Sequence, residues 1–316
     1  MRLRFWALVA IAAAAAAGWW RWPAPPLDAT TVPAVEHPVF SEGAGPAVLV
    51  DNAHWNAATS VRGLAGFAEL LRRDGYRVLP DGNATRAEML ADARIAVVAN
   101  PLGLSGVLRA LAGNLGLPPI TALDDEALWL QEMETTIQWV ENGGALLVAV
   151  DEGPPARAVR GLTSRLGVQV GDGVAIDLGH SEPLAPDRLV FSRENGLIGT
   201  HPIVDGGADR QAVNRLVSVG GPSLSGPEGS VALLVLSPSA VEVPRLGVSP
   251  AAGTLVPGRA RAVAFTRGRG RVVVVADTAL VTGLVDGDGR PYGLGADGTQ
   301  ADRFARGVMR WLARLD

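Results

Sequence analysis

The chain has 316 residues, 48% of them hydrophobic and 19% charged, with a formal net charge of −4. These values are typical of a globular protein with a sizeable core, and they give no electrostatic basis for a nucleic-acid partner. Cysteine is absent, which excludes disulfides, thiolate nucleophiles and cysteine-ligated zinc.

Residues 1–22 have the composition of a membrane-targeting segment. Arg2 and Arg4 precede the uncharged run Phe5–Trp20, which spans roughly 24 Å as a helix. A cleaved signal peptide is one interpretation. The other is a retained signal anchor in the inner or cytoplasmic membrane, with residues 5–20 as a transmembrane helix, because tryptophans cluster at its end as they do at membrane interfaces. Both interpretations place the body in the periplasm or extracytoplasmic space.

Residues 23–45 are rich in proline and show no apolar period. This composition predicts an extended, semi-rigid linker between the membrane segment and the body. The folded domain is then expected to cover residues 46–316.

The first half of the body alternates between short apolar runs and amphipathic segments, as βα units do. Residues 102–123 are rich in glycine and weakly patterned, and they are expected to form a loop with a short helix. The predicted strands are Ala47–Val50, Tyr76–Leu79, Ile95–Ala99 and Ala145–Val150. The predicted helices are Arg62–Asp74, Thr85–Ala93, Asp124–Glu141 and Pro155–Leu166.

The second half has a different pattern. Residues 168–258 predict loops and short strands, with Val231–Leu236 as the strongest. Ala260–Phe265 and Arg271–Ala276 flank a glycine turn and predict a hairpin, and Asp302–Leu315 predicts a closing amphipathic helix. The sum is a three-layer α/β/α flavodoxin-like fold around a mostly parallel sheet, with a β-rich portion in its C-terminal half.

Polar side chains follow three of the predicted strands. Because the carboxyl ends of parallel strands meet at one edge of a sheet, we expect these side chains to form a ligand site there. An equally simple interpretation is that they form hydrogen-bonded loops and helix caps. The candidates are Asp51, Asn52, His54, Asn56, Asp151, Glu152, Asp277 and Thr278.

Two further interpretations concern this edge. Asp51 and His54, with the other carboxylates, could bind a divalent cation, although the spacing does not require a metal and no other cofactor is indicated. His201 lies in the irregular region and could reach the same edge, but a solvated loop histidine is the simpler alternative.

Six segments occur in an order that resembles a known superfamily. They are AVLVDNAHWN, ELLRRDGYRV, WVENGGALLVAVDE, the HPI at 201–203, RGRGRVVVVADTALVTG and ADRFARGVMRWLARL. Over residues 46–316 the chain resembles a bacterial membrane-tethered domain of unknown function in the class I glutamine amidotransferase-like superfamily. That domain is related to the gliding-motility and ABC-transport-associated proteins of the GldG type and to intraflagellar-transport proteins that share it.

The resemblance implies a flavodoxin-like fold without glutaminase chemistry. Where the superfamily places its catalytic cysteine, after Ala145–Val150, this chain has Asp151, Glu152, Gly153 and Pro154. The first hypothesis is therefore a non-catalytic, membrane-anchored, extracytoplasmic domain that binds a small ligand or a protein partner such as a transporter. The second is a metal-assisted hydrolase in which a carboxylate or His54 acts as base.

Overall fold

The computed structural model describes residues 32–61, 63–80, 82–114, 126–207, 211–285 and 291–315. The predicted membrane segment, residues 1–22, lies outside them. In the part of the chain that the structure describes, no helix has the length and apolar character needed to cross a membrane.

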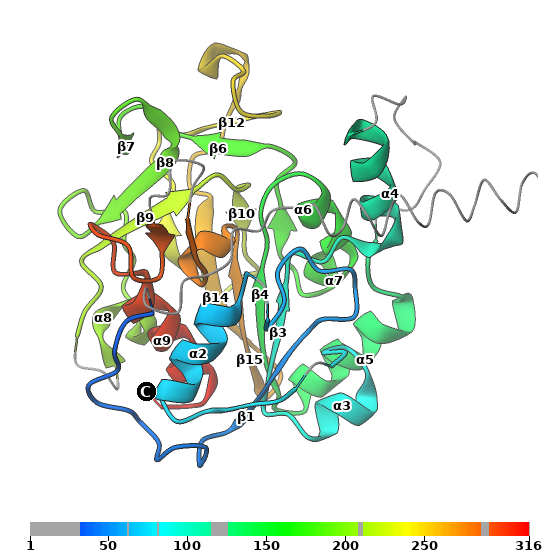
Figure 1. The fold of residues 1–316 in the computed structure, drawn as a ribbon. Helices are drawn as coiled ribbons and strands as arrows, with labels where there is room; N and C mark the ends of the chain where they lie inside the picture. The colour runs from blue at the N-terminus through cyan, green and yellow to red at the C-terminus, as the bar shows by residue number, and fades with distance from the viewer. Residues whose placement is uncertain are drawn as a thin grey trace, which may run out of the picture.

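A mostly parallel sheet forms the centre of the molecule (Figure 1). Its parallel part has the order β2-β1-β3-β4-β15, and β14 pairs with β15 as the antiparallel partner of the predicted hairpin. Beyond β14 the sheet continues through β10 to β5, while β11 also pairs with β14. The parallel strands are β1 (Ala47–Val50), β2 (Arg77–Val78), β3 (Ile95–Ala99), β4 (Ala145–Ala149) and β15 (Gly270–Val275). The others are β5 (Gln169–Val170), β10 (Leu224–Ser225), β11 (Val231–Val235) and β14 (Ala260–Arg267).

Helices cover both faces of this sheet (Figure 1). One face carries α2 (Ala65–Arg73), α8 (Pro202–Asp205) and α9 (Ala301–Leu312). The other carries α3 (Ala87–Ala91), α5 (Leu130–Glu141), α6 (Pro154–Ala158) and α7 (Arg160–Arg165). Within β1, Val48 and Val50 enter the core on the side of α2 and α9, whereas Leu49 enters the core on the side of α3 and α5. The predicted three-layer α/β/α architecture is confirmed.

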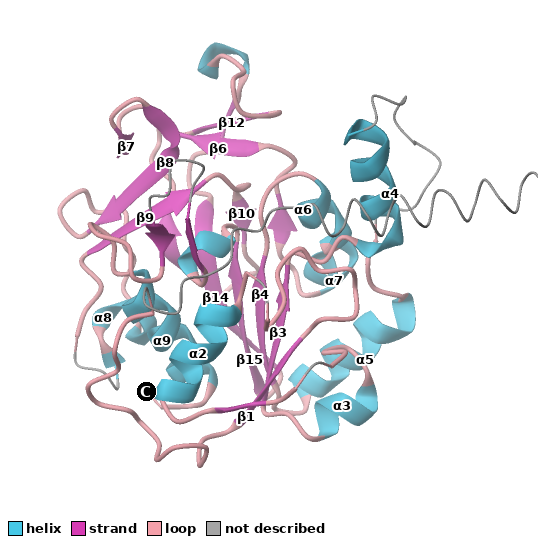
Figure 2. Cartoon of the chain, viewed as in Figure 1, coloured by secondary structure: helices cyan, strands magenta, loops and turns pink. Residues whose placement is uncertain are grey.

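The β-rich portion forms two small sheets above one end of the central sheet (Figure 2). The strands of the first are β6 (Val174–Ile176), β12 (Val241–Val243) and β13 (Thr254–Leu255). Those of the second are β7 (Ser181–Glu182), β8 (Ala185–Ser192) and β9 (Arg215–Val219). A separate hairpin comprises β16 (Gly283–Val285) and β17 (Pro291–Gly293), and short 3₁₀ turns occur at η3 (Pro250–Ala252) and η4 (Thr278–Leu280).

One helical prediction agrees with the structure and another differs from it. The short helix expected within residues 102–123 is α4 (Gly103–Asn114), which packs against α6, so tertiary contact outweighs the low helix propensity of its glycines. The predicted helix Pro155–Leu166 is divided at Val159, which ends α6 and precedes α7.

Residues 32–45, the described part of the predicted linker, form a strap against the domain instead of a free spacer. Val32 is only 5% exposed, and its carbonyl accepts a hydrogen bond from Arg73 Nη1 at 2.7 Å. Further along, Phe40 meets Tyr76 edge to face at 5.2 Å, and the Gly45 amide donates to Gly75 O. The strap packs on the domain because its valines and Phe40 contact the core. These apolar residues are irregularly spaced between prolines, so the sequence did not reveal the packing.

A buried ion pair links the strap to two helices. Arg310 of α9 donates to both carboxylate oxygens of Asp74, at 2.9 Å and 2.6 Å, and also to His37 O in the strap. The same carboxylate accepts the amide of Val39. The side chains of Asp74 and Arg310 are 0% and 2% exposed, so neither charge has water as an alternative partner.

Loss of one member of this pair should therefore be costly. We expect Arg310→Leu to lower the free energy of unfolding by about 3–5 kcal/mol, since it leaves a buried, unpaired carboxylate. Adding Asp74→Asn to Arg310→Leu should recover part of the loss, because the uncompensated charge is removed. Denaturant unfolding of the three proteins measures both effects.

The matched control is the half-exposed pair Arg267–Glu141, in which Arg267→Ala should cost about 1 kcal/mol or less. A loss for Arg310→Leu no larger than that of the control would contradict the role assigned to the buried pair.

Candidate functional site

The loop after β1 holds a buried carboxylate–histidine pair. Asp51 Oδ2 lies 2.8 Å from His54 Nδ1 and accepts a 3.0 Å hydrogen bond from Asn56 Nδ2. The other oxygen of Asp51 accepts the amide of Ala84, and Asn56 also donates to Ala99 O at the end of β3. These bonds fix the loop across the carboxyl ends of β1 and β3.

His54 faces a second carboxylate that the sequence did not indicate. Its Nε2 lies 3.3 Å from Glu132 Oε2, in the first turn of α5. Glu132 is held in turn by Asn83, which donates to Oε1 at 3.1 Å, and by the amide of Trp129. Both ring nitrogens of His54 therefore point at carboxylates, and the side chain is 6% exposed.

The electrostatics of this group favour a charged imidazolium. Burial lowers the pKa of His54, but the hydrogen bond and charge of Asp51, joined by Glu132, outweigh burial and raise that pKa above 6.5. Burial works to raise the pKa of Glu132, whereas the Trp129 amide, Asn83 and His54 lower it, and the lowering prevails. The three side chains form a negative–positive–negative bridge between the β1 loop and α5.

A second cluster joins the ends of β3, β4 and β15. Asp151 accepts the Thr278 amide at 2.7 Å and the Thr278 hydroxyl at 2.9 Å. Asn100 donates from its side chain to the Asp151 carboxylate, and its own Oδ1 accepts the Asp151 amide at 2.8 Å. Asn100 has φ of 42°, a left-handed conformation that asparagine tolerates and that turns its side chain toward Asp151. Asn100 directly follows the predicted strand Ile95–Ala99 and is not among the candidate residues expected from the sequence.

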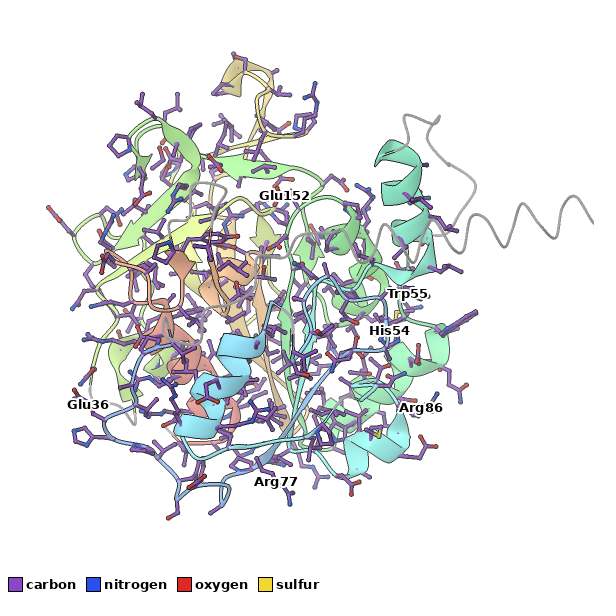
Figure 3. All side chains as sticks on the ribbon, viewed as in Figure 1. Glu36, His54, Trp55, Arg77, Arg86 and Glu152 are labelled. Carbon is purple, nitrogen blue, oxygen red and sulfur yellow. The ribbon has the colours of Figure 1, made fainter. Side chains whose placement is uncertain are left out.

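Asp277 and Glu152 lie beside this cluster and hold the β-rich portion. Asp277 accepts the amides of Val219 at 2.6 Å and Ala279 at 2.8 Å. Burial, reinforced by the charge of Asp151, raises the pKa of Asp277 to about 7. Glu152 accepts the Gly221 amide at 2.8 Å. Figure 3 shows His54 and Trp55 beside α5, and Glu152 above the upper end of the sheet.

The turn from β4 into α6 has the backbone of a nucleophile elbow. Its apex, Gly153, has φ of 74° and ψ of −130°, which is strained for any residue with a side chain. Hydrolases that use such an elbow place their nucleophile on this strained strand-to-helix turn. A Cβ built at Gly153 would meet no atom within 4 Å, so the apex is open, but glycine offers no nucleophile there.

The predicted residues thus form two adjoining hydrogen-bonded groups, to which Asn52 and His201 do not belong. Asn52 bonds reciprocally with Ser60 within its own loop. His201 caps α8 and packs edge-on against Trp311, over which Arg271 at the start of β15 also lies. His201 is therefore at the amino end of the parallel strands, opposite the edge that it was expected to reach.

The metal interpretation has no support in this geometry. Asp51 and His54 face each other and not a shared opening, and the oxygens of Asp151 are taken by Asn100 and Thr278. Within the described ranges, no group of three or more histidine, aspartate or glutamate side chains is arranged to hold a metal ion.

Comparison with known proteins agrees with the fold. No family model and no curated protein matches the sequence. Among solved structures, the mmIFT52 N-terminal domain superposes with a TM-score of 0.55 at 15% identity, over 84% of this chain and 96% of that one. This likeness shows that the chain has the mixed α/β fold of that domain.

Two other solved structures are similar at lower scores. A ThuA-like protein from Bacteroides uniformis has a TM-score of 0.42 and 15% identity, over 86% of this chain and 94% of its own. Cytoplasmic Protein STM3548 from Salmonella typhimurium has a TM-score of 0.45 and 11% identity, over 84% and 98% of the two chains.

The charge of His54 should make part of the stability depend on pH. Since its folded-state pKa is raised, the stabilisation is fully present below about pH 6.5 and is lost as pH rises through the raised pKa. We expect the difference in free energy of unfolding between wild type and His54→Gln to shrink between about pH 6 and about pH 9. Denaturant unfolding across this range measures the difference.

His37→Gln provides the control, because the His37 side chain is exposed on the strap. A wild-type advantage over His54→Gln that stays constant or grows with pH would contradict the bridged imidazolium.

The open elbow can be tested with a single thiol, because the chain has no cysteine. We expect Gly153→Cys to fold with a loss of about 1–2 kcal/mol from its left-handed φ and to react readily with a disulfide reagent such as Ellman's reagent. Ala149→Cys, at a fully buried position at the end of β4, should react only on unfolding. Equal reaction rates for the two thiols would show that the apex is not open.

Proposed function

We propose that this protein is a non-catalytic binding or scaffold domain, anchored in the inner or cytoplasmic membrane with its body outside the cytoplasm, where it docks a protein partner such as a transport system of the ABC type. The observation that carries the proposal is Gly153, which stands at the apex of the elbow in place of a nucleophile.

The polar edge supports binding over catalysis. A general base needs a ring nitrogen or carboxylate oxygen that can reach a substrate. At this edge both nitrogens of His54 and both oxygens of Asp51 bond to protein groups, so the bridge fixes loops and presents no reactive atom. The same bonds weigh against a metal-assisted hydrolase, since they leave neither His54 nor Asp51 an atom for a metal or a substrate.

An exposed apolar surface beside this bridge supports a docking role. His54 O accepts the amides of Leu102 and Gly103, which brings the Trp55 loop against the start of α4, and Glu132 ties the same loop to α5. Trp129 is 79% exposed. Exposing so large an apolar side chain to water is unfavourable, and such residues often become buried against a binding partner. We name this surface the tryptophan patch; it comprises Trp55, Leu104, Trp129 and Leu130.

The membrane part of the proposal rests on the sequence of residues 1–22. The strap leaves only residues 23–31 between that segment and Val32, which is already packed on the domain. At about 3.5 Å per residue, this spacer reaches roughly 30 Å. A tether of that length would keep the domain close to the membrane, within reach of a membrane-embedded partner.

The docking role predicts a crosslink from the tryptophan patch. A photoreactive phenylalanine analogue at Trp129, in the full chain in its native membranes, should form one adduct with a membrane-embedded transporter subunit, identified by mass spectrometry. Trp129→Glu should abolish co-purification of that subunit and change the free energy of unfolding by no more than about 0.5 kcal/mol, since the side chain is exposed.

Leu184→Glu is the matched control, because Leu184 is fully exposed in the turn between β7 and β8. Co-purification that survives Trp129→Glu, or an adduct with soluble proteins alone, would overturn the docking role. Extraction of the chain by alkaline carbonate would overturn the anchor separately.

A further inference from the structure

A second carboxylate–histidine pair lies in the β-rich portion. His180 stands in the turn between β6 and β7, and its Nδ1 lies 3.0 Å from Asp177 Oδ2. Asp177 is 3% exposed, whereas the His180 side chain is 34% exposed. The pair therefore has a buried carboxylate behind an accessible ring.

Asp177 is held as an ionised acceptor by several donors. Ser237 donates to Oδ2, while Ser239 at 3.2 Å and the Gly179 amide at 3.0 Å donate to Oδ1. Burial works to raise the pKa of Asp177, but Ser237, Gly179 and His180 outweigh burial and lower that pKa. An ionised Asp177 accepts the proton on Nδ1, so neutral His180 carries its lone pair on Nε2.

His54, His180 and His201 differ in the hydrogen-bond partners of their ring nitrogens. His54 has both nitrogens on carboxylates, and His201 uses Nδ1 to accept the Ile203 amide. In His180, by contrast, no described protein group bonds to Nε2. A carboxylate that orients a histidine and leaves its outer nitrogen available is the arrangement that proteins use for ligand and proton binding.

The His180 ring lines a groove of about 640 Å³ on the sheet of β7, β8 and β9. Glu182 also lines it, but its charge is compensated by Arg188 at 2.7 Å and by Arg215 at 3.7 Å. Glu194 lines the groove as well, is exposed, and forms no described ion pair. Arg215 lines the groove too, so three carboxylates (Asp177, Glu182 and Glu194) stand against two guanidinium groups (Arg188 and Arg215), and the net charge around the groove is −1.

We propose that this groove binds the ammonium group of a small organic amine, with His180 Nε2 and Glu194 as its acceptors and Asp177 as the residue that orients the ring. An ammonium donates up to three hydrogen bonds and carries the single positive charge that balances the net charge of −1. A neutral hydroxyl could meet Nε2 equally well but would leave that net negative charge unbalanced.

Calorimetric titration of the detergent-solubilised full chain with 1,4-diaminobutane tests this site. We expect saturable binding, at least about tenfold tighter than that of 1,4-butanediol, which has the same length and no charge. His180→Ala and Glu194→Gln should each weaken diamine binding by about tenfold or more.

Glu228→Gln is the matched control, since Glu228 is an exposed carboxylate outside the groove. Equal affinity for diamine and diol, or diamine binding unchanged by His180→Ala, would overturn the proposal, as would absence of diamine binding. Trp129→Glu should leave diamine binding intact, so failure of the amine site and failure of the tryptophan patch are distinguishable.

Discussion

The constraint on which the arrangement of the sheet edge depends is a fully buried guanidinium. Arg261 of β14 donates to the carbonyls of Pro222 at 2.8 Å, Ala276 at 3.2 Å and Ala175 at 3.1 Å. These bonds join the central sheet to the β-rich portion. Burial lowers the pKa of Arg261, and the charges of Asp277, Glu152, Glu242 and Asp151 oppose that change. A guanidinium in the interior needs such compensating charge, because desolvation of an isolated ion is costly.

This requirement gives the strand-end carboxylates a structural explanation. Asp151, Glu152 and Asp277 bond to backbone amides of the β-rich portion or of the next turn, and together they balance Arg261. The close packing extends to Gly221, where a Cβ would lie 1.8 Å from Ala276 O. Carboxylates at this edge of an α/β sheet therefore need not indicate catalysis; here they compensate a charge and fasten one part of the fold to another.

Periodicity predicted most of the central sheet because β1, β3 and β4 are continuous apolar runs, as in Ile95–Ala99 and Ala145–Ala149. It placed a short helix within residues 102–123 but did not give the bounds of α4, whose glycines have low helix propensity and which packs against α6. It also missed the strap, since Asp74 and Arg310 are far apart in sequence and their pairing leaves no local signal. Glu132 and Asn83 were missed for the same reason. A contact between the His54 loop and residues far along the chain leaves no signal in the local sequence.

The elbow shows how a fold can keep a strand-to-helix turn of this geometry with no nucleophilic side chain at its apex. The left-handed turn at Gly153 is needed wherever β4 must reverse into α6, and glycine adopts it without strain. A side chain at this position would be strained by the positive φ. Proteins tolerate such strain mainly at functional sites, where the surrounding structure compensates for it. Among the residues that could stand at this apex, glycine is the one that conformational energy favours. The open apex is then a consequence of the turn, and the carboxylates around it bond to backbone amides and balance the charge of Arg261.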